Sequence, residues 1–169
     1  MHHLVRSRRA QAMVEFSLLA PLFFLLLFGV IDLGRAGFYF VLGSDLARQG
    51  ARYASDYGNT GTGISNAQVA GQVQQQANAA AIGTFDIPAG CGTVTPPQPP
   101  AALSVCQKPA VGEMHIFIED IAACPACVPA TPHYKKVSTV YAFQPATPML
   151  SSITGTIYIV ATAAMTTEY

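Results

Sequence analysis

The clearest chemical motif in this sequence is Cys124-Pro125-Ala126-Cys127, a Cys-x-x-Cys pattern. In thioredoxin-like enzymes this pattern is redox-active, but it then lies at the start of a helix in a βαβ unit, and no such unit is predicted here. A zinc site is a second interpretation, with Cys124 and Cys127 joined by His115 and His133, although no second Cys-x-x-Cys supports it. The motif therefore favours a structural bridge over a redox enzyme or a metal centre.

The four cysteines of the chain are an even number, which is typical of disulfide-bonded proteins in an oxidising compartment. Four cysteines allow three pairings. The least demanding of these joins Cys91 to Cys106 and Cys124 to Cys127, and we expect these two bridges in the folded chain.

A second residue with chemical potential is Glu15, because it stands at the edge of an apolar run. No ionisable group occurs from Phe16 to Ile31. A carboxylate in hydrocarbon costs at least about 2.5 kcal/mol, so its presence is a functional hypothesis that needs a cationic partner. Arg8 and Arg9, seven and six residues earlier, are one candidate. The charge of Asp32 has a simpler explanation, because Arg35 lies three residues later and can form a local ion pair with it.

The element that carries these carboxylates is predicted to be a membrane-spanning helix. The apolar segment from about Ala12 to Leu33 has about 22 residues, and as a helix it would be about 33 Å long, close to the thickness of a bilayer core. Three arginines precede it, which predicts a cytoplasmic N-terminus and an extracytoplasmic chain after Arg35. A cleaved signal peptide is the alternative, and Gly34-Arg35-Ala36 offers a cleavage pattern. Its apolar region would, however, be shorter than this one.

The N-terminal pattern resembles a known family. Residues 8–16 are similar to a type IVb prepilin leader, in which a small residue is followed by four residues, a glutamate and an aromatic residue. Residues 18–35, 47–54 and 153–168 resemble the TadE-like pseudopilins of the tight-adherence pilus. The middle of the chain, from Asn59 to about Tyr134, carries no such resemblance.

This resemblance implies roles for four residues. A membrane prepilin peptidase would cleave between Ala10 and Gln11, with Ala10 standing where most type IV prepilins have glycine. Glu15 and Phe16 then become the fifth and sixth residues of the mature chain. Cleavage exposes a cationic amine on Gln11, and this amine would pair with Glu15 of a neighbouring subunit or of the same helix.

The resemblance also implies partners and a location. The chain would be a minor pseudopilin that serves as a structural or assembly subunit of the pilus. It would be anchored in the bacterial inner membrane with a periplasmic head, and extracellular once in a pilus. Its partners would be other pilin and pseudopilin subunits, the peptidase, the inner-membrane assembly platform and the lipid bilayer.

The rest of the chain predicts an α+β head. The first helix should continue through residues 45–54 and end in the glycine-rich turn at 58–63. A capping box at Ser65-Asn66-Ala67-Gln68 predicts a second helix that ends at about Ile82. Alternation of β-branched and polar residues predicts a small antiparallel sheet packed on the helices, with strands at 114–119, 136–143 and 153–162. We thus expect a leader at residues 1–10, a transmembrane helix at 11–35 and a head at 36–169.

The composition excludes other classes. Nine basic and nine acidic residues give a net charge of zero, so the chain lacks the positive surface that nucleic-acid binding requires. The sequence contains neither a phosphate-binding loop nor a nucleophile motif, and we expect no enzyme and no cofactor. The alternative function is an unprocessed, single-pass membrane-anchored domain that binds a protein or small ligand outside the cytoplasm.

Overall fold

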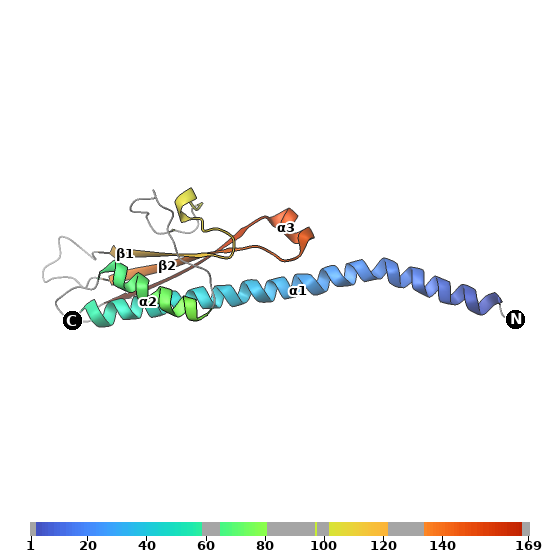
Figure 1. Ribbon diagram of the computed structural model, residues 1–169, viewed down its shortest axis with the longest axis horizontal. Coiled ribbons are helices and arrows are strands. Elements are labelled where there is room, and N and C mark those ends of the chain that lie inside the picture. The colour runs from blue at the N-terminus through green and yellow to red at the C-terminus, as the bar shows by residue number, and fades with distance from the viewer. Residues whose placement is uncertain (1–2, 59–64, 81–96, 98–101, 122–133, 167–169) are drawn as a thin grey trace.

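The long helix α1 (His3–Gly58) organises the molecule in this computed structural model, which describes residues 3–58, 65–80, 97, 102–121 and 134–166. Its 56 residues give a length of about 84 Å at about 1.5 Å per residue. Figure 1 shows that its N-terminal half projects alone from the molecule, while its C-terminal half lies along the head. The projecting half is bent, and Pro21 lies inside it. Proline bends a helix because it removes one backbone hydrogen bond and clashes with the preceding turn.

The remaining elements form the head and confirm the α+β class. Three strands form an antiparallel sheet in the order β1-β2-β3, as expected. The described elements after α1 are α2 (Asn66–Ala79), the 3-10 helix η1 (Val105–Gln107), β1 (Met114–Ile121), β2 (Tyr134–Phe143), α3 (Pro148–Thr154) and β3 (Ile157–Thr166).

The start of α2 confirms the predicted capping box. The Ser65 side chain accepts a hydrogen bond from the Gln68 backbone N–H, and the Ser65 backbone N–H donates to the Gln68 side chain. The helix ends at Ala79, three residues before the expected Ile82. Its buried residues recur every four positions and belong to the core shared with α1 and the sheet: Val69, Val73 and Ala77.

The predicted strand at 153–162 was wrong at its beginning. Residues 148–154 form the short helix α3, and β3 begins only at Ile157. Pro148 occupies the first turn of α3, where its missing N–H costs nothing and its fixed φ suits a helix. Gly155, with φ 62°, ends the helix and turns the chain into β3.

The core lies where α1 meets one face of the sheet. Alternate residues of β2 point to α1. The small residues on the buried side of α1 let the helix backbone come close to the sheet. A Cβ on Gly50 would lie 2.6 Å from Cγ2 of Val73 and 3.3 Å from Cγ1 of Val137, so only glycine fits there. Nearer the projecting half of the helix, Tyr39 of α1 stacks on Tyr141 with ring centroids 4.2 Å apart. Burial, followed by the hydrogen bond with Tyr39, raises the pKa of Tyr141 and keeps this hydroxyl neutral.

Candidate assembly site and helix–head junction

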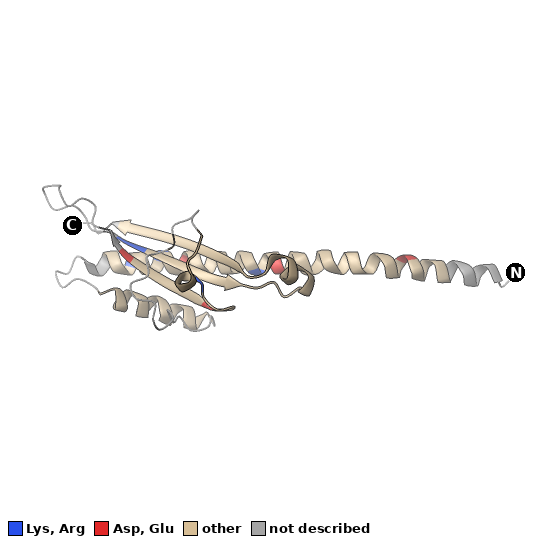
Figure 2. Ribbon diagram, turned by 90° about the horizontal axis from the view of Figure 1, so that it is seen from above, with Lys and Arg blue, Asp and Glu red and all other residues tan. Residues whose placement is uncertain are grey.

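The first half of α1 is an exposed apolar surface. Every side chain from Ala10 to Leu19 is exposed, and the exposed fraction reaches 71% for Phe16 and 74% for Leu18. Within the described residues, this helix is long and apolar enough to cross a membrane, and none of its most apolar stretch is buried in the protein. Figure 2 shows the projecting half with almost no charge and most charged residues over the head. A helix that is apolar all round requires an apolar environment, either lipid or other subunits.

Glu15 lies on this surface, and among the described side chains it has one polar contact. Its Oε1 accepts a hydrogen bond from Nε2 of Gln11, one turn earlier, at 3.4 Å. That distance is long for an N–H···O bond, so the interaction is weak. The side chains of Arg8 and Arg9 lie outside the part of the molecule that the structure describes. Glu15 and Phe16 are both exposed and thus open to a neighbouring molecule.

The peptide bond proposed for cleavage lies in the same helix. Ala10 and Gln11 are both helical and exposed, and α1 runs through them without a break. The structure thus places Ala10, Gln11, Glu15 and Phe16 on two successive turns near the N-terminal end of α1. It brings none of them near the head.

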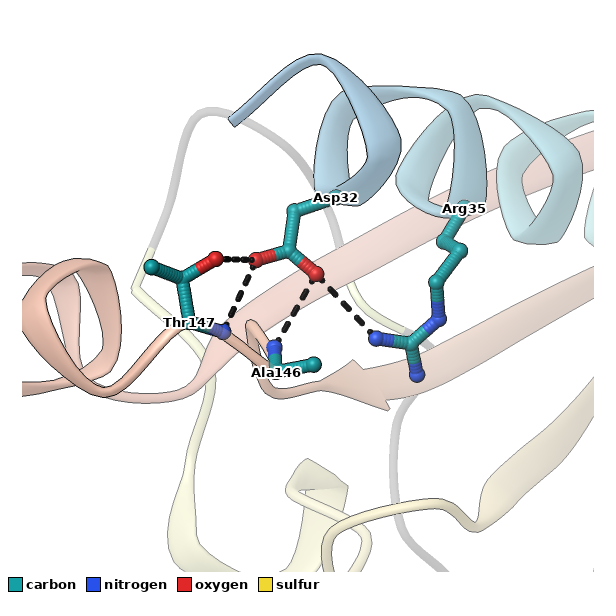
Figure 3. Close-up of polar contacts among 4 residues, drawn as sticks. All are labelled: Asp32, Arg35, Ala146 and Thr147. Atoms are coloured by element: carbon teal, nitrogen blue, oxygen red, sulfur yellow. Dashed lines mark hydrogen bonds and ion pairs between the residues drawn. The ribbon is translucent and has the colours of Figure 1, made fainter. Parts of the chain in front are cut away.

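Asp32 lies at the junction between the projecting half of α1 and the head, and it is 4% exposed. Oδ1 accepts hydrogen bonds from Nη1 of Arg35 at 3.1 Å and from the backbone N–H of Ala146 at 3.0 Å. Oδ2 accepts one from the backbone N–H of Thr147 at 3.0 Å and one from the Thr147 hydroxyl at 2.7 Å. Figure 3 shows the carboxylate pointing from α1 into the β2–α3 connection, so that both oxygens are occupied.

The junction extends the sequence-based interpretation of Asp32. The predicted ion pair with Arg35 is present, but three of the four hydrogen bonds come from residues 114 or 115 positions later in the chain. Asp32 therefore ties the head to the helix. No local pattern around Asp32 or in the stretch Pro145–Pro148 signals this contact.

Most of the cysteine and zinc predictions fall outside the described residues. Cys106, next to the buried Gln107 in η1, is disulfide-bonded. Cys91, Cys124, Cys127 and His133 lie outside the described residues, so both the pairing and the zinc alternative stay predictions. His115 is buried on β1. Within the described residues, no three His, Cys, Asp or Glu side chains form a cluster that could hold a metal ion.

Residues 10–52 match the family model described as TadE-like protein. The chain carries a TadE-like segment. This segment begins at Ala10 and covers the exposed apolar half of α1, the Asp32 junction and most of the helix that packs on the sheet. The match confirms the predicted resemblance for the N-terminal part of the chain. The similarity expected for residues 153–168 lies beyond it and stays a prediction.

The match of this TadE-like segment supports an association of the protein with the tight-adherence pilus. This family is one of structural and assembly proteins of the pilus. Neither the search of curated proteins nor the search of solved structures returned a match.

Proposed function

We propose that this protein is a minor pseudopilin of the tight-adherence pilus, anchored by α1 in the inner membrane before it enters the filament. The N-terminus is cytoplasmic and the head periplasmic, and the basic residues before the apolar segment support this orientation. The expected partners are pilin and pseudopilin subunits, the prepilin peptidase and the assembly platform.

One observation carries the proposal: a single helix has an exposed apolar half and a half that is packed on the head. The exposed half is suited first to lipid and then to the helices of other subunits. The packed half fixes the head to that helix, so a subunit moves from membrane to filament as one body. The TadE-like segment, which spans both halves, supports the assignment to this pilus system.

Glu15 is proposed to recognise a neighbouring subunit. Cleavage after Ala10 would leave a cationic amine on Gln11, and an amine and a carboxylate attract strongly in apolar surroundings. The long Gln11–Glu15 hydrogen bond leaves the Glu15 carboxylate with most of its accepting capacity free. A neighbour's amine would occupy this capacity, and the pairing would offset the cost of keeping both charges away from water.

The cleavage step is tested by N-terminal sequencing of the protein from cells with an active prepilin peptidase. The expected mature chain begins at Gln11. Recovery of only the full-length chain would contradict the processing step and would favour the unprocessed, membrane-anchored binding domain.

The pairing step is tested by the ratio of this protein in sheared pili to that in membranes. Glu15→Gln keeps the shape of the side chain and removes its charge, so we expect normal membrane insertion, normal cleavage and a much lower ratio. Gln11→Ala is the matched control, because it removes the 3.4 Å hydrogen bond but keeps both the amine and the carboxylate. We expect its ratio to equal that of the wild type. Equal ratios for the wild type and Glu15→Gln would show that the charge pair does not drive assembly.

A further inference from the structure

The helix α3 is the part of the head that reaches furthest along α1 towards the N-terminus (Figure 1). Its first residue follows Thr147, which the Asp32 carboxylate holds by two hydrogen bonds. Beside this contact, a cavity of about 210 Å³ is lined by Phe28, Ile31, Asp32, Ala146, Thr147 and Pro148. The start of α3 therefore lies level with the last apolar turn of the projecting helix.

Two large apolar side chains of α3 are exposed, beside the exposed hydroxyl residues Ser152 and Thr154. Met149 and Ile153 are four positions apart, hence on one face of the helix, and they are 63% and 79% exposed. The sequence contains no charged residue from Val137 to Thr167, so no Lys, Arg, Asp or Glu occurs in α3 or in its flanking segments. A charge-free helix with two large apolar side chains on its open face suits an apolar or interfacial environment.

The hydroxyl groups of α3 are satisfied within the helix itself. Ser151 donates to the carbonyl of Pro148, Ser152 to that of Met149, and Thr154 to that of Leu150, at 2.9 or 3.0 Å. A side-chain hydroxyl that bonds to its own helix backbone does not need water as a partner. These polar side chains are therefore compatible with a site from which water is partly excluded.

Bilayer dimensions place α3 at the membrane surface. A hydrocarbon core of about 30 Å takes about 20 helical residues, which extend from Ala12 to Ile31 when counted back from the charged Asp32. Asp32 then marks the boundary on the side of the head, and α3 begins beside Phe28 and Ile31, in the last turn of the span.

We propose that α3 lies in the headgroup region of the leaflet nearest the head and inserts Met149 and Ile153 among the lipid chains. This inference rests on the proposed membrane anchoring by α1. The occupant of this apolar surface is lipid, since α3 begins beside Phe28 and Ile31, in the last apolar turn of the helix that is proposed to cross the bilayer. A second contact with the membrane, beside the single span, would fix the tilt and rotation of the head above it.

Tryptophan fluorescence tests this placement, because the chain contains no tryptophan. The full-length chain is reconstituted in phosphatidylcholine–phosphatidylglycerol vesicles with one tryptophan in each variant: Ile153→Trp on α3, Leu18→Trp in the span, and Val105→Trp on η1. Val105 is 85% exposed and controls for the preference of tryptophan for interfaces. Lipids brominated near the headgroup or near the chain ends report the depth of each probe.

We expect Ile153→Trp to show blue-shifted emission and strong quenching by lipids brominated near the headgroup. Leu18→Trp should be quenched by deep bromine, and Val105→Trp by aqueous acrylamide alone. Adding Met149→Asp to Ile153→Trp should reverse its blue shift.

The outcomes separate two failures. If Ile153→Trp behaves like Val105→Trp while Leu18→Trp is quenched by lipid, the placement of α3 is wrong and the anchoring stands. If Leu18→Trp is not quenched by lipid, the proposed anchoring itself fails. If the blue shift of Ile153→Trp disappears when the protein is diluted into excess lipid, another copy of the chain covers α3, and the lipid proposal is overturned.

Discussion

The two halves of α1 belong to one continuous helix but differ in whether their apolar side chains are buried within the protein. From Ala10 to Ile31, large apolar side chains cover the whole circumference and remain exposed. From Asp32 onward, one stripe of mostly small residues is buried against the sheet and α2. The other side exposes large apolar residues next to the junction and carries charged residues from Asp45 onward; the apolar ones are Leu33, Phe38, Phe40 and Val41. The first half requires its surroundings to supply an apolar phase, whereas the second half carries its own in the head.

The glycines show the same contrast at atomic scale. No described atom lies within 4 Å of a Cβ built on Gly29, Gly34 or Gly37. A Cβ on Gly43 would lie 3.1 Å from Oγ1 of Thr139, and one on Gly50 would collide with Val73. Gly43 and Gly50 therefore serve internal packing, while Gly29 in the projecting half and Gly34 and Gly37 just after the junction leave open surface.

The largest effect on stability is expected at Gly50. Gly50→Leu forces a large side chain into a site where even a Cβ is 2.6 Å from Val73, and we expect a loss of about 3 kcal/mol or more. Thermal unfolding of the detergent-solubilised full-length chain, followed by near-ultraviolet circular dichroism of the tyrosines, measures the change. Gly29→Leu is the matched control and should leave the unfolding temperature of the head unchanged. A similar loss in both variants would end the distinction between the two halves.

The next effect concerns the junction between the halves. Asp32→Asn leaves one carbonyl oxygen for two backbone donors, Ala146 and Thr147, and turns an N–H₂ group towards one of them. We expect faster hydrogen exchange of these two amides and a looser α3. Arg35→Gln, which removes only the bond from the exposed guanidinium, should have a smaller effect. Equal exchange rates in the two variants would mean that the local ion pair alone holds the junction.

A smaller effect is expected where the packed half meets the sheet through a polar contact. The buried Thr139 hydroxyl donates to the carbonyl of Gly43 at 3.1 Å. Thr139→Val keeps the shape of the side chain and should lower the free energy of unfolding by about 1 kcal/mol. Denaturant unfolding measures this loss. An unchanged midpoint would show that the hydrogen bond contributes nothing beyond packing.

The smallest effect, of opposite sign, is expected at Gly37. Alanine is the better helix former by nearly 1 kcal/mol, and nothing described lies where its methyl group would go, so Gly37→Ala should slightly stabilise α1. Gly43→Ala gains the same propensity but brings its methyl group to 3.1 Å from Oγ1 of Thr139. A higher unfolding temperature for Gly37→Ala than for Gly43→Ala is the expected result. The reverse order would show that Gly37 packs against a partner.

Local sequence patterns predicted most of the elements. The capping box at Ser65 placed the start of α2, and β-strand alternation placed β1 and β2 to within two residues at each end. The apolar run predicted the first half of α1 because hydropathy is a property of the segment itself. The error was α3, although Thr147 followed by Pro148 at the first helical position was a usable helix-start signal.

Contacts between segments that are distant in the sequence could not be predicted in the same way. The hydrogen bonds from Ala146 and Thr147 to Asp32 depend on the path of the whole chain between them, and a local ion pair with Arg35 already explained the charge. For the same reason the sequence could not separate Gly50 from Gly37, because the neighbours that distinguish them come from α2 and β2. The exposure of Glu15 and Phe16 follows from the long apolar helix and was predictable.

The Asp32 junction also has a mechanical consequence. Tension applied along the projecting half of α1 reaches the hydrogen bonds of this carboxylate before it reaches the strands packed further along. The three hydrogen bonds that Ala146 and Thr147 donate to its two oxygens are loaded side by side and share the force, whereas bonds loaded in succession would break one at a time. A subunit pulled by its helix therefore transmits the load to the β2–α3 connection first, and the core behind Tyr39 carries only the remainder.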